Sequence, residues 1–504
     1  MHRNKLLSIV HQNHARKLRK GLLFRPQRSY TYTNGEVGMQ VEVNTEDQEV
    51  AIALGSNIGD RMRNFNTALR MMRSHGINIK RHACLYETSP AYITDQPRFL
   101  NSAVRATTKL LPHHLLQLLK TIEAQMGRTA GIRYGPRPID LDILFYSNLK
   151  VRSDKLIVPH ERIYERPFVI GPLVDLLGSE VENDVVASWN SHRNVMDVWN
   201  EGMLEKEGML RVMPVNGKLW DWSDRRTVMG VLNVTPDSFS DGGKFLAVGT
   251  AMERVKEMVA EGADIVDIGA QSTRPKASKI SPEEELERLI PVLEAVAEMP
   301  EMAGKIISVD TFYSQVAAEA VARGAHIIND VSGGEADSEM VKVMRDLEVP
   351  YVVMHARGDP STMQKEENLR YRNVCEEVGR ELYSRAASAE AGGVPAWRIV
   401  IDPGIGFAKN TKQNLEILRG IGEIKEAIAR NSFAVSRCPF MIGPSRKRFL
   451  GDICGREAAA ERDAATVACV TTAMIGGADI LRVHNVRDNV DAVKVCDAMR
   501  KIKE

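Results

Sequence analysis

Short apolar runs alternate with charged amphipathic stretches from Thr227 onward, and this alternation is the feature that most limits the possible folds. The stretches include Ser281–Glu298, Ser314–Arg323 and Asn414–Ala429, which have helical spacing. The eight runs are Val228–Val234, Asp264–Gly269, Ile306–Asp310, His326–Val331, Tyr351–His355, Ile399–Pro403, Phe440–Gly443 and Ile480–Val483. They predict a (β/α)8 TIM barrel over residues 225–504. A doubly wound open sheet is the alternative, but its GxGxxG pattern does not follow the first run.

Each of the eight runs ends in, or leads into, polar residues. The carboxyl ends of barrel strands carry the active site, so these residues are candidates. Helix capping explains any single one of them but not all eight. Donors suited to an anionic group such as a diphosphate are Asn233, Arg274, Arg482 and His484. Donors and acceptors suited to a planar heterocycle are Asp310, Asn329, Asp402 and Lys447.

Residues 46–205 have a different pattern, which predicts a compact α/β or α+β domain. Expected strands are Val50–Leu54, Phe99–Thr107 and Leu141–Tyr146, and expected helices are Asn64–Met72, His113–Met126 and Phe168–Val174. Residues 206–224 mix charges, glycine and tryptophan, and we expect a connector there.

Asp140 and Asp142 stand two residues apart on the expected strand, so both carboxylates project from one face. Two hard oxygen ligands at this spacing suit Mg²⁺ together with phosphate oxygens. A solvated strand face is the simpler explanation, but arginines at positions 128, 133 and 137 lie just upstream in a glycine-bearing loop. Neither a P-loop nor the protein-kinase motifs occur, so a nucleotide would be bound on another scaffold.

The second part of the chain resembles dihydropteroate synthase over residues 225–504, through NVTPDSFSDGG, STRP, VDT, IND, DPGIGF, GPSRK and RVH in this order. That family joins a dihydropterin diphosphate to p-aminobenzoate. The resemblance implies that Asn233 binds Mg²⁺ and diphosphate, and that the diphosphate is held by Arg274, Arg482 and His484. It assigns the pterin to Asp310, Asn329, Asp402 and Lys447, and the p-aminobenzoate site to Thr273, Pro275, Phe407 and Ser445. Ala270 and Gln271 depart from the Gly-Glu that often precedes STRP.

The first part resembles 6-hydroxymethyl-7,8-dihydropterin pyrophosphokinase over residues 48–178, through LGSNIGD, DQPRFLN, YGPRPIDLDI and VPHERIYERPF. That family has a ferredoxin-like α+β fold and moves diphosphate from ATP to a pterin alcohol. The resemblance implies that Asp140 and Asp142 bind two Mg²⁺ ions and that ATP is contacted by Arg128, Arg137, His160 and Arg166. It places the pterin on Asn101, between Phe99 and Phe168, and places Glu123 near the nucleotide. The departures are a shortened loop, Arg128–Gly135, Tyr134 where Trp is frequent, and Phe99 where Tyr is frequent.

Together the two resemblances imply a bifunctional enzyme of folate biosynthesis, because the first product is the second substrate. The implied substrates are ATP, the hydroxymethyldihydropterin and p-aminobenzoate, and a homodimer or higher oligomer through the barrel is a family expectation. A pterin-dependent methyltransferase barrel is the alternative, but the SRK motif and the Arg-His pair disfavour it. The intact DLD and SRK motifs also disfavour a degenerate, non-enzymatic scaffold.

Residues 1–35 contain no Asp or Glu, which is typical of a transit peptide. With abundant Arg and little Ser, residues 1–45 predict a leader to the mitochondrial matrix, and a basic arm that contacts membrane or nucleic acid is the alternative. A net charge of +1 disfavours a nucleic-acid partner. The longest apolar stretch, Ala464–Ala478, is too short to span a membrane, and the six cysteines form no CxxC pair that would favour a disulfide framework or zinc site.

Overall fold

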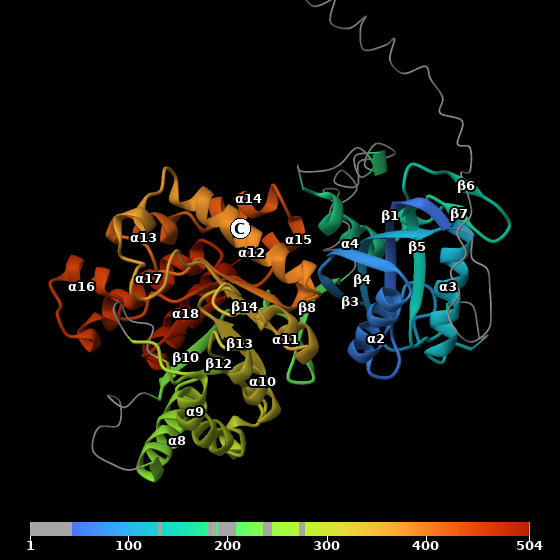
Figure 1. The fold of residues 1–504 in the computed structure, drawn as a ribbon. Helices are drawn as coiled ribbons and strands as arrows, with labels where there is room; N and C mark the ends of the chain where they lie inside the picture. Colours follow the sequence, from blue (N-terminus) through green and yellow to red (C-terminus); the bar gives the residue numbers. More distant parts are fainter. Residues whose placement is uncertain are drawn as a thin grey trace, which may run out of the picture.

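We describe the protein from a computed structural model, in which the described residues are 43–129, 134–179, 185, 188, 189, 208–234, 244–271 and 278–502. They form two domains that lie side by side (Figure 1). The predicted leader lies outside the described residues except for its last three, which belong to strand β1 (Val43–Ser56). Within the described ranges, no helix has the length and apolar character needed to cross a bilayer.

The first domain is built on a seven-stranded antiparallel sheet in the order β5-β1-β4-β3-β8-β9, with β2 also paired to β4. After β1, its strands are β2 (Ile77–His82), β3 (Leu85–Thr88), β4 (Phe99–Leu110), β5 (Asp140–Tyr146), β8 (Leu210–Val215) and β9 (Lys218–Trp220). A separate two-stranded ribbon consists of β6 (Val151–Arg152) and β7 (Ile157–Val158).

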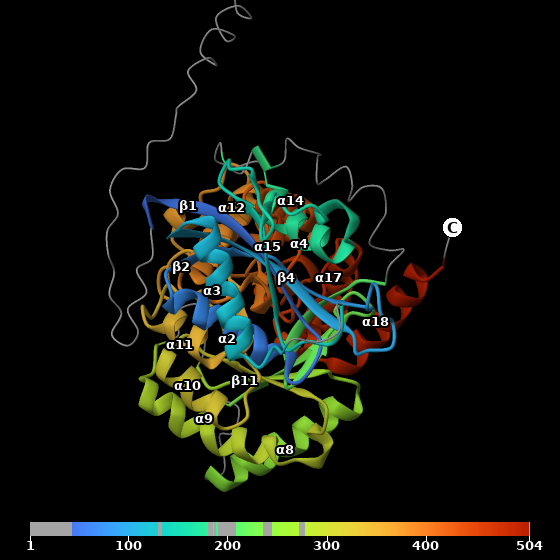
Figure 2. The same ribbon diagram turned by 90° about the vertical axis from the view of Figure 1, so that its right-hand side faces the viewer.

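Helices cover both faces of this sheet, so that β1 has buried residues on both sides. Ile52 and Leu54 of β1 pack into one core with α2 (Arg61–Ser74) and α3 (Pro112–Gln125), which lie next to each other in Figure 2. Ala51 packs into a second core with α4 (Pro167–Leu177) on the opposite face. The predicted ferredoxin-like α+β domain is confirmed.

The segment expected as a connector contains the hairpin β8–β9 instead. Strand β8 pairs with β3 and so extends the sheet of the first domain, with Val212 opposite Leu85. From the same segment, Met213, Val215 and Trp222 pack against the strands of the second domain. Short strands whose partners lie far away in the chain have no periodic sequence signal, which explains why this hairpin was not predicted.

The second domain is the predicted barrel, with eight parallel strands in the order β15-β14-β13-β12-β11-β10-β17-β16. An isolated bridge between Ile401 and Phe440 brings the two ends of this order together. The strands are β10 (Thr227–Asn233), β11 (Ile265–Gly269), β12 (Ile306–Asp310), β13 (Ile327–Asp330), β14 (Tyr351–Met354), β15 (Ile399–Asp402), β16 (Met441–Ile442) and β17 (Ile480–Val483). Each coincides with a predicted run to within about two residues.

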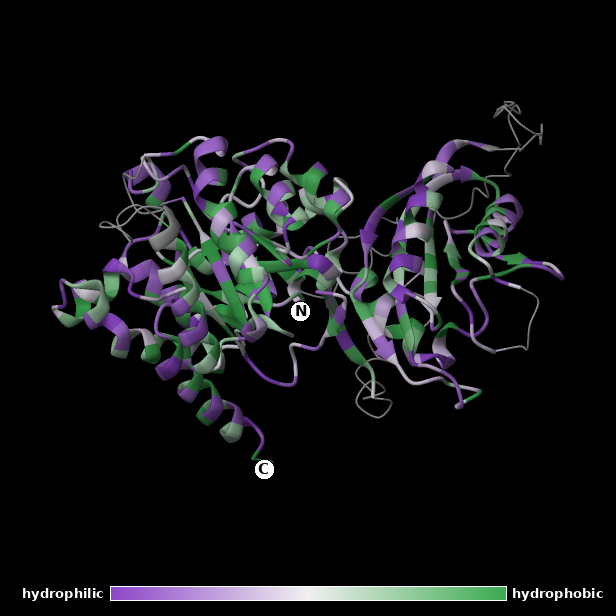
Figure 3. Cartoon of the chain, turned by 90° about the horizontal axis from the view of Figure 1, so that it is seen from below, coloured by the Kyte–Doolittle hydropathy of each residue, from purple (hydrophilic) through white to green (hydrophobic). Residues whose placement is uncertain are grey.

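Helices surround the barrel, and Figure 3 shows hydrophobic strands enclosed by helices that carry many hydrophilic residues. They are α8 (Lys244–Ala260), α9 (Pro282–Ala297), α10 (Ser314–Ala322), α11 (Met340–Leu347), α12 (Val374–Ala391), α13 (Thr411–Arg419), α14 (Ile421–Ala429), α15 (Phe433–Ser436), α16 (Arg448–Cys454), α17 (Asp463–Ile475) and α18 (Val486–Arg500). The stretch Asn414–Ala429, expected as one helix, is divided into α13 and α14. Gly420 ends α13, and Cys375 packs so close to it that a side chain has no room there.

The interior of the barrel changes from apolar to polar along the strands. The layer nearest the amino ends consists of Met229, Ile265, Ile327, Val352, Val400, Met441 and Ile480, and the hairpin segment packs against it. Two residues further along, four of these seven strands carry Asp267, Asn329, Asp402 and Arg482. Because alternate strand residues face the same side, these polar groups project above the apolar layer toward the carboxyl ends.

The first domain docks on the amino-terminal end of the barrel. Trp397, which precedes β15, packs edge-on against Phe65 and His82 of the first domain. Glu390, near the end of α12, accepts a hydrogen bond of 3.0 Å from the backbone N–H of His82. Further contacts join Arg398 and Glu348 to Asn66, and Asn431 to Arg81. All these barrel residues lie where helices end and strands begin, opposite the predicted barrel site.

Candidate functional site

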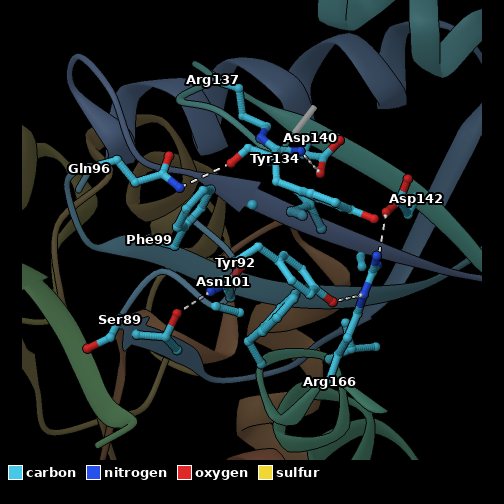
Figure 4. Close-up of a pocket in the computed structure, with 17 residues that line it drawn as sticks. Ser89, Tyr92, Gln96, Phe99, Asn101, Tyr134, Arg137, Asp140, Asp142 and Arg166 are labelled. Carbon is cyan, nitrogen blue, oxygen red and sulfur yellow. Dashed lines mark hydrogen bonds and ion pairs between the residues drawn. The ribbon is translucent and has the colours of Figure 1, made fainter. Parts of the chain in front are cut away.

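A pocket opens in the first domain beside β1, β4 and β5 (Figure 4). Its lining includes Gly55, Thr88, Tyr92, Gln96, Phe99, Asn101, Tyr134, Arg137, Asp140, Asp142, Arg166 and Phe168. Asn101 is 6% exposed and donates a hydrogen bond of 2.8 Å to Thr88 Oγ1. The pocket therefore offers aromatic rings, a buried amide, cations and a pair of carboxylates, which together suit a flat polar ring that carries a phosphate-bearing group.

The two carboxylates of β5 face a group of cations. Asp140 accepts hydrogen bonds from Arg128 at 2.5 Å and from Arg137 at 2.8 Å. These arginines hold the pKa of Asp140 below its ordinary value, despite its burial. Asp142 lies 3.9 Å from Arg166 and 4.0 Å from Lys120. The lowered pKa keeps Asp140 in the ionised, acceptor form that a divalent cation needs.

Glu123 and His160 lie behind this edge and are not among the residues that line the pocket. Glu123 is 3% exposed and accepts a hydrogen bond of 2.7 Å from the backbone N–H of Leu141, between the two aspartates. Its carboxylate also pairs with Arg128 at 2.7 Å. Glu123 is therefore placed to support β5 and its loop. His160 accepts from the backbone of Arg162, and burial lowers its pKa.

Two loop tyrosines are joined above the pocket by Arg162, which sequence reasoning did not single out. Its guanidinium donates to the hydroxyls of Tyr92 and Tyr134, both at 2.7 Å. The two rings lie 4.3 Å apart between centroids. Tyr134, which replaces the more frequent Trp, thus uses a hydroxyl that Trp lacks. Phe99, the other aromatic departure, lies under the guanidinium of Arg137 at 5.6 Å.

In the barrel, Arg482 joins two carboxylates. Its Nε donates to Asp267 and its Nη2 donates to Asp310, each at 2.7 Å. Asn329 donates to the same oxygen of Asp267 at 3.1 Å. Burial raises the pKa of Asp310 to about 7, although Arg482 opposes this shift. Asp267, which was not predicted, therefore joins two of the predicted residues, Arg482 and Asn329, and Arg482 links them to a third, Asp310.

Asp402 ends β15, and Lys447 lies in the loop after the neighbouring strand β16, at the same end of the barrel. The Lys447 ammonium lies 4.3 Å from the centre of the Phe407 ring, a cation–π contact. Burial, reinforced by Arg482, lowers the pKa of Lys447 to about 8, and burial raises the pKa of Asp402 to about 6. Asp402 also accepts a 2.7 Å hydrogen bond from the backbone N–H of Gly404, which fixes the start of its loop.

Ser445 and His484 form a pair beside Arg482. Ser445 Oγ lies 2.9 Å from His484 Nδ1 and accepts from the His484 backbone N–H at 3.0 Å. Burial and the nearby Arg482 lower the pKa of His484 to about 3, so the imidazole is neutral at neutral pH. Asn233 stands exposed at the end of β10.

Thr273, Arg274 and Pro275 lie outside the described residues, so their predicted roles stay predictions. The departure that precedes them is described. Gln271 accepts from the backbone N–H of Ile280 at 3.1 Å and donates to the carbonyl of Ser278 at 3.4 Å. Gln271 therefore joins the two ends of the segment that holds these three residues. Across the described residues, no cluster of three or more His, Cys, Asp or Glu has the arrangement of a metal site.

Two family models match this chain. The model described as "7,8-dihydro-6-hydroxymethylpterin-pyrophosphokinase" matches residues 51–178, and the model described as "Pterin binding enzyme" matches residues 229–484. A Pisum sativum protein named "Folate synthesis bifunctional protein, mitochondrial" is 63% identical over 471 residues, which is 92% of each chain. An Arabidopsis thaliana protein of the same name is 59% identical over 476 residues, covering 93% of this chain and 86% of the relative.

Solved structures match the whole chain or its second domain. A Plasmodium falciparum HPPK-DHPS triple mutant with pteroate matches 91% of this chain and 96% of its own, with a TM-score of 0.71 and 23% identity, which concerns the fold alone. A Xanthomonas albilineans dihydropteroate synthase with 4-aminobenzoic acid matches 58% of this chain and all of its own, with a TM-score of 0.51 and 38% identity.

Proposed function

The chain belongs to the family of bifunctional folate synthesis proteins, and we propose how residues of its two domains carry out the two reactions of that family. The first reaction transfers diphosphate from ATP to 6-hydroxymethyl-7,8-dihydropterin and releases AMP. The second condenses that product with p-aminobenzoate to 7,8-dihydropteroate and releases diphosphate. The names of the pea and Arabidopsis relatives favour this pair of reactions over a methyltransferase barrel.

In the first domain, Asn101 binds the pterin ring at its polar edge while Phe99 and Phe168 lie against its faces. All three line the pocket, and Asn101 is buried and oriented by Thr88. Arg137 and Arg166 line the same pocket and neutralise the ATP phosphates. Arg128, which donates a hydrogen bond to Asp140, contributes a third positive charge. The protein's work is to position the alcohol and the phosphate and to stabilise charge on the transferred group.

Mg²⁺ fits this site, because Asp140 and Asp142 present carboxylate oxygens from one face of β5 into a pocket rich in cations. The two aspartates would hold the metal, which supplies charge neutralisation to the phosphates of ATP. The arginine contacts of Asp140 would then be shared with the nucleotide. Glu123 supports the strand from behind, and His160 and Arg166 complete the nucleotide side.

In the barrel, the pterin ring lies among Asp310, Asn329, Asp402 and Lys447, and its diphosphate meets Arg482 and His484. These residues gather above the apolar layer of the barrel. Arg482 and Lys447 stabilise the negative charge that develops on the departing diphosphate. Phe407 and Ser445 border the p-aminobenzoate, whose amine attacks the pterin methylene. We assign Thr273, Arg274 and Pro275 to the same substrates, and Asn233 to Mg²⁺ and diphosphate.

The protein is mitochondrial, as the names of the pea and Arabidopsis relatives state for those proteins. We infer that residues 1–45 form the import leader, since residues 1–35 carry no acidic residue. We also infer self-association through the barrel, and no nucleic-acid or membrane partner.

One observation carries this proposal: a single chain holds both the paired aspartates beside a pocket lined with aromatic rings and the Arg482 network in the barrel. A coupled assay of the full chain with ATP, hydroxymethyldihydropterin and p-aminobenzoate tests it. We expect AMP and dihydropteroate in equal amounts. Omission of ATP should stop the reaction unless pterin diphosphate is supplied. Failure to form dihydropteroate from pterin diphosphate and p-aminobenzoate would refute the second activity.

A further inference from the structure

Asp267 occupies an inward position in the middle of β11, directly above the apolar layer. Both Asp267 and the inward residue two positions before it, Ile265, are fully buried, but Ile265 belongs to the apolar layer and Asp267 carries a carboxyl group. One oxygen, Oδ2, accepts both of its side-chain hydrogen bonds, from Arg482 Nε at 2.7 Å and from Asn329 Nδ2 at 3.1 Å. Asp267 thus contacts two proposed substrate-binding residues.

Stability alone does not explain an aspartate at this position. The other oxygen, Oδ1, is buried and has no hydrogen-bond partner within the described parts of the chain. A buried carboxylate with one unsatisfied oxygen costs more free energy than an apolar side chain of similar size would. The two contacts it does make are therefore the feature that distinguishes Asp267 from its apolar neighbours.

The geometry of the guanidinium shows what these contacts accomplish. Arg482 has five N–H donors in a rigid plane, and bonds at Nε and Nη2 fix the orientation of that plane. Nη1 makes no hydrogen bond that involves the described residues, and we assign this nitrogen to the incoming anion. Asp310 is the less buried of the two carboxylate partners, at 7% exposed against 0% for Asp267. Asp267 is therefore the deeper of the two anchors.

We propose that Asp267 is a positioning residue of the barrel site: it holds Arg482 and Asn329 in the orientations in which they meet the diphosphate and the pterin. The inference rests on the proposed second reaction and adds a residue that acts through two others. It predicts that replacement of Asp267 lowers kcat/KM for pterin diphosphate. The KM for p-aminobenzoate should change little, because the proposal assigns that substrate to other side chains.

The first test is Asp267→Asn, which keeps the shape of the side chain and removes its charge. We expect kcat/KM for pterin diphosphate to fall by about 10- to 100-fold, as for loss of a charge-assisted hydrogen bond. KM for p-aminobenzoate should stay within about twofold of the wild type. The unchanged KM for p-aminobenzoate reports that the barrel site is folded, and the AMP-forming reaction of the first domain gives the amount of intact chain in the same tube.

The matched control is Asp264→Asn. Asp264 precedes the same strand at its opposite end and holds Arg225 through bonds of 2.6 and 3.0 Å. It is a more exposed aspartate–arginine pair, three residues before Asp267 at the amino end of the strand and outside the proposed site. We expect this variant to keep the wild-type kcat/KM for pterin diphosphate.

A double-mutant cycle shows whether Asp267 acts through Arg482. We expect Arg482→Gln and the double variant Asp267→Asn/Arg482→Gln to have similar kcat/KM for pterin diphosphate, because the anchor has no role once the arginine is gone. Multiplied losses in the double variant would overturn the proposal. This comparison also decides the matter if Asp267→Asn alone does not fold, since the double variant leaves no unbalanced arginine.

An Asp267→Asn variant whose kcat/KM is within about twofold of the wild type would likewise overturn the inference while leaving the second activity intact. Absence of dihydropteroate formation in the wild-type chain is a different result and would refute the proposed function itself.

Discussion

Arg128 Nη1 lies 2.5 Å from Asp140 Oδ1, so an arginine of the adjoining loop already holds the carboxylate that we assign to Mg²⁺. Arg137 holds the other oxygen of the same carboxylate at 2.8 Å. A metal ion and its nucleotide would have to compete with these cations or share the carboxylate with them. Asp140 is therefore the residue on which the charges of the first site converge.

Replacement of Asp140 by Ala should remove the carboxylate that Arg128 and Arg137 contact. We expect AMP formation to fall by about 100-fold or more, because a metal ligand and the partner of two arginines are lost together. Dihydropteroate formation from supplied pterin diphosphate should continue, since that site is in the other domain. Asp154→Ala, an exposed carboxylate of the β6–β7 turn, is the control. Unchanged AMP release in Asp140→Ala would contradict the metal assignment.

The second reaction should have a bell-shaped pH dependence. Burial raises the pKa of Asp402 to about 6 and of Asp310 to about 7, and it lowers the pKa of Lys447 to about 8. As pH falls, the aspartates take up protons and lose acceptor capacity; as pH rises past about 8, Lys447 loses its charge. We expect kcat/KM for pterin diphosphate to decline on both sides of this interval.

Lys447→Arg tests the assignment of the alkaline decline. Arginine stays protonated throughout this pH range, so the decline should move to higher pH even if the maximal rate is lower. A pH profile of kcat/KM for pterin diphosphate, measured on both forms, is the required experiment. The same alkaline decline in both proteins would show that another group is responsible.

The domain interface should make the two domains unfold together. Trp397 of the barrel is 2% exposed and packs with Phe65 and His82 of the first domain. We expect Trp397→Ala to destabilise the docked state by about 3–5 kcal/mol and to split one calorimetric transition into two. Trp189→Ala is a matched control, because Trp189 is equally buried but stacks on Phe145 within its own domain. A single transition in Trp397→Ala would argue against coupling through this tryptophan.

The pterin diphosphate made by the first domain should pass through solvent. The first domain docks where Glu348, Arg398 and Asn431 precede strands, whereas the second site lies at the opposite, carboxyl ends of the barrel strands. Unlabelled pterin diphosphate added to a coupled reaction with labelled pterin should therefore dilute the label in dihydropteroate completely. Retention of label above the mixing ratio would show transfer between sites.

Local patterns were sufficient to predict the barrel. Each strand is a short buried run between amphipathic helices. Its position can therefore be predicted from the sequence around it, without knowing which strands it pairs with. The polar strand ends were likewise visible one strand at a time. Arg482, Asp310 and Asn329, predicted from three separate strands, do share one network in the structure.

Features that depend on distant contacts were not predictable. Asp267 stands inside an apolar run, and only its contacts with Arg482 and Asn329 distinguish it from a solvated or structural carboxylate. Arg162 joins two tyrosines from separate loops, and no motif spans that distance. Gly420 interrupts an amphipathic stretch because Cys375 packs against it, which the period of the stretch does not reveal.

Because of the hairpin β8–β9, the chain cannot be cut between its two domains without removing contacts from one of them. One of its edges completes the sheet of the first domain, and side chains of the same segment pack against the floor of the barrel. A chain cut before Leu210 would leave the pyrophosphokinase half with an open sheet edge, and a cut after Trp222 would leave the synthase half with an uncovered apolar floor. Separation into two independent genes would therefore require the half that loses this segment to acquire a replacement for it.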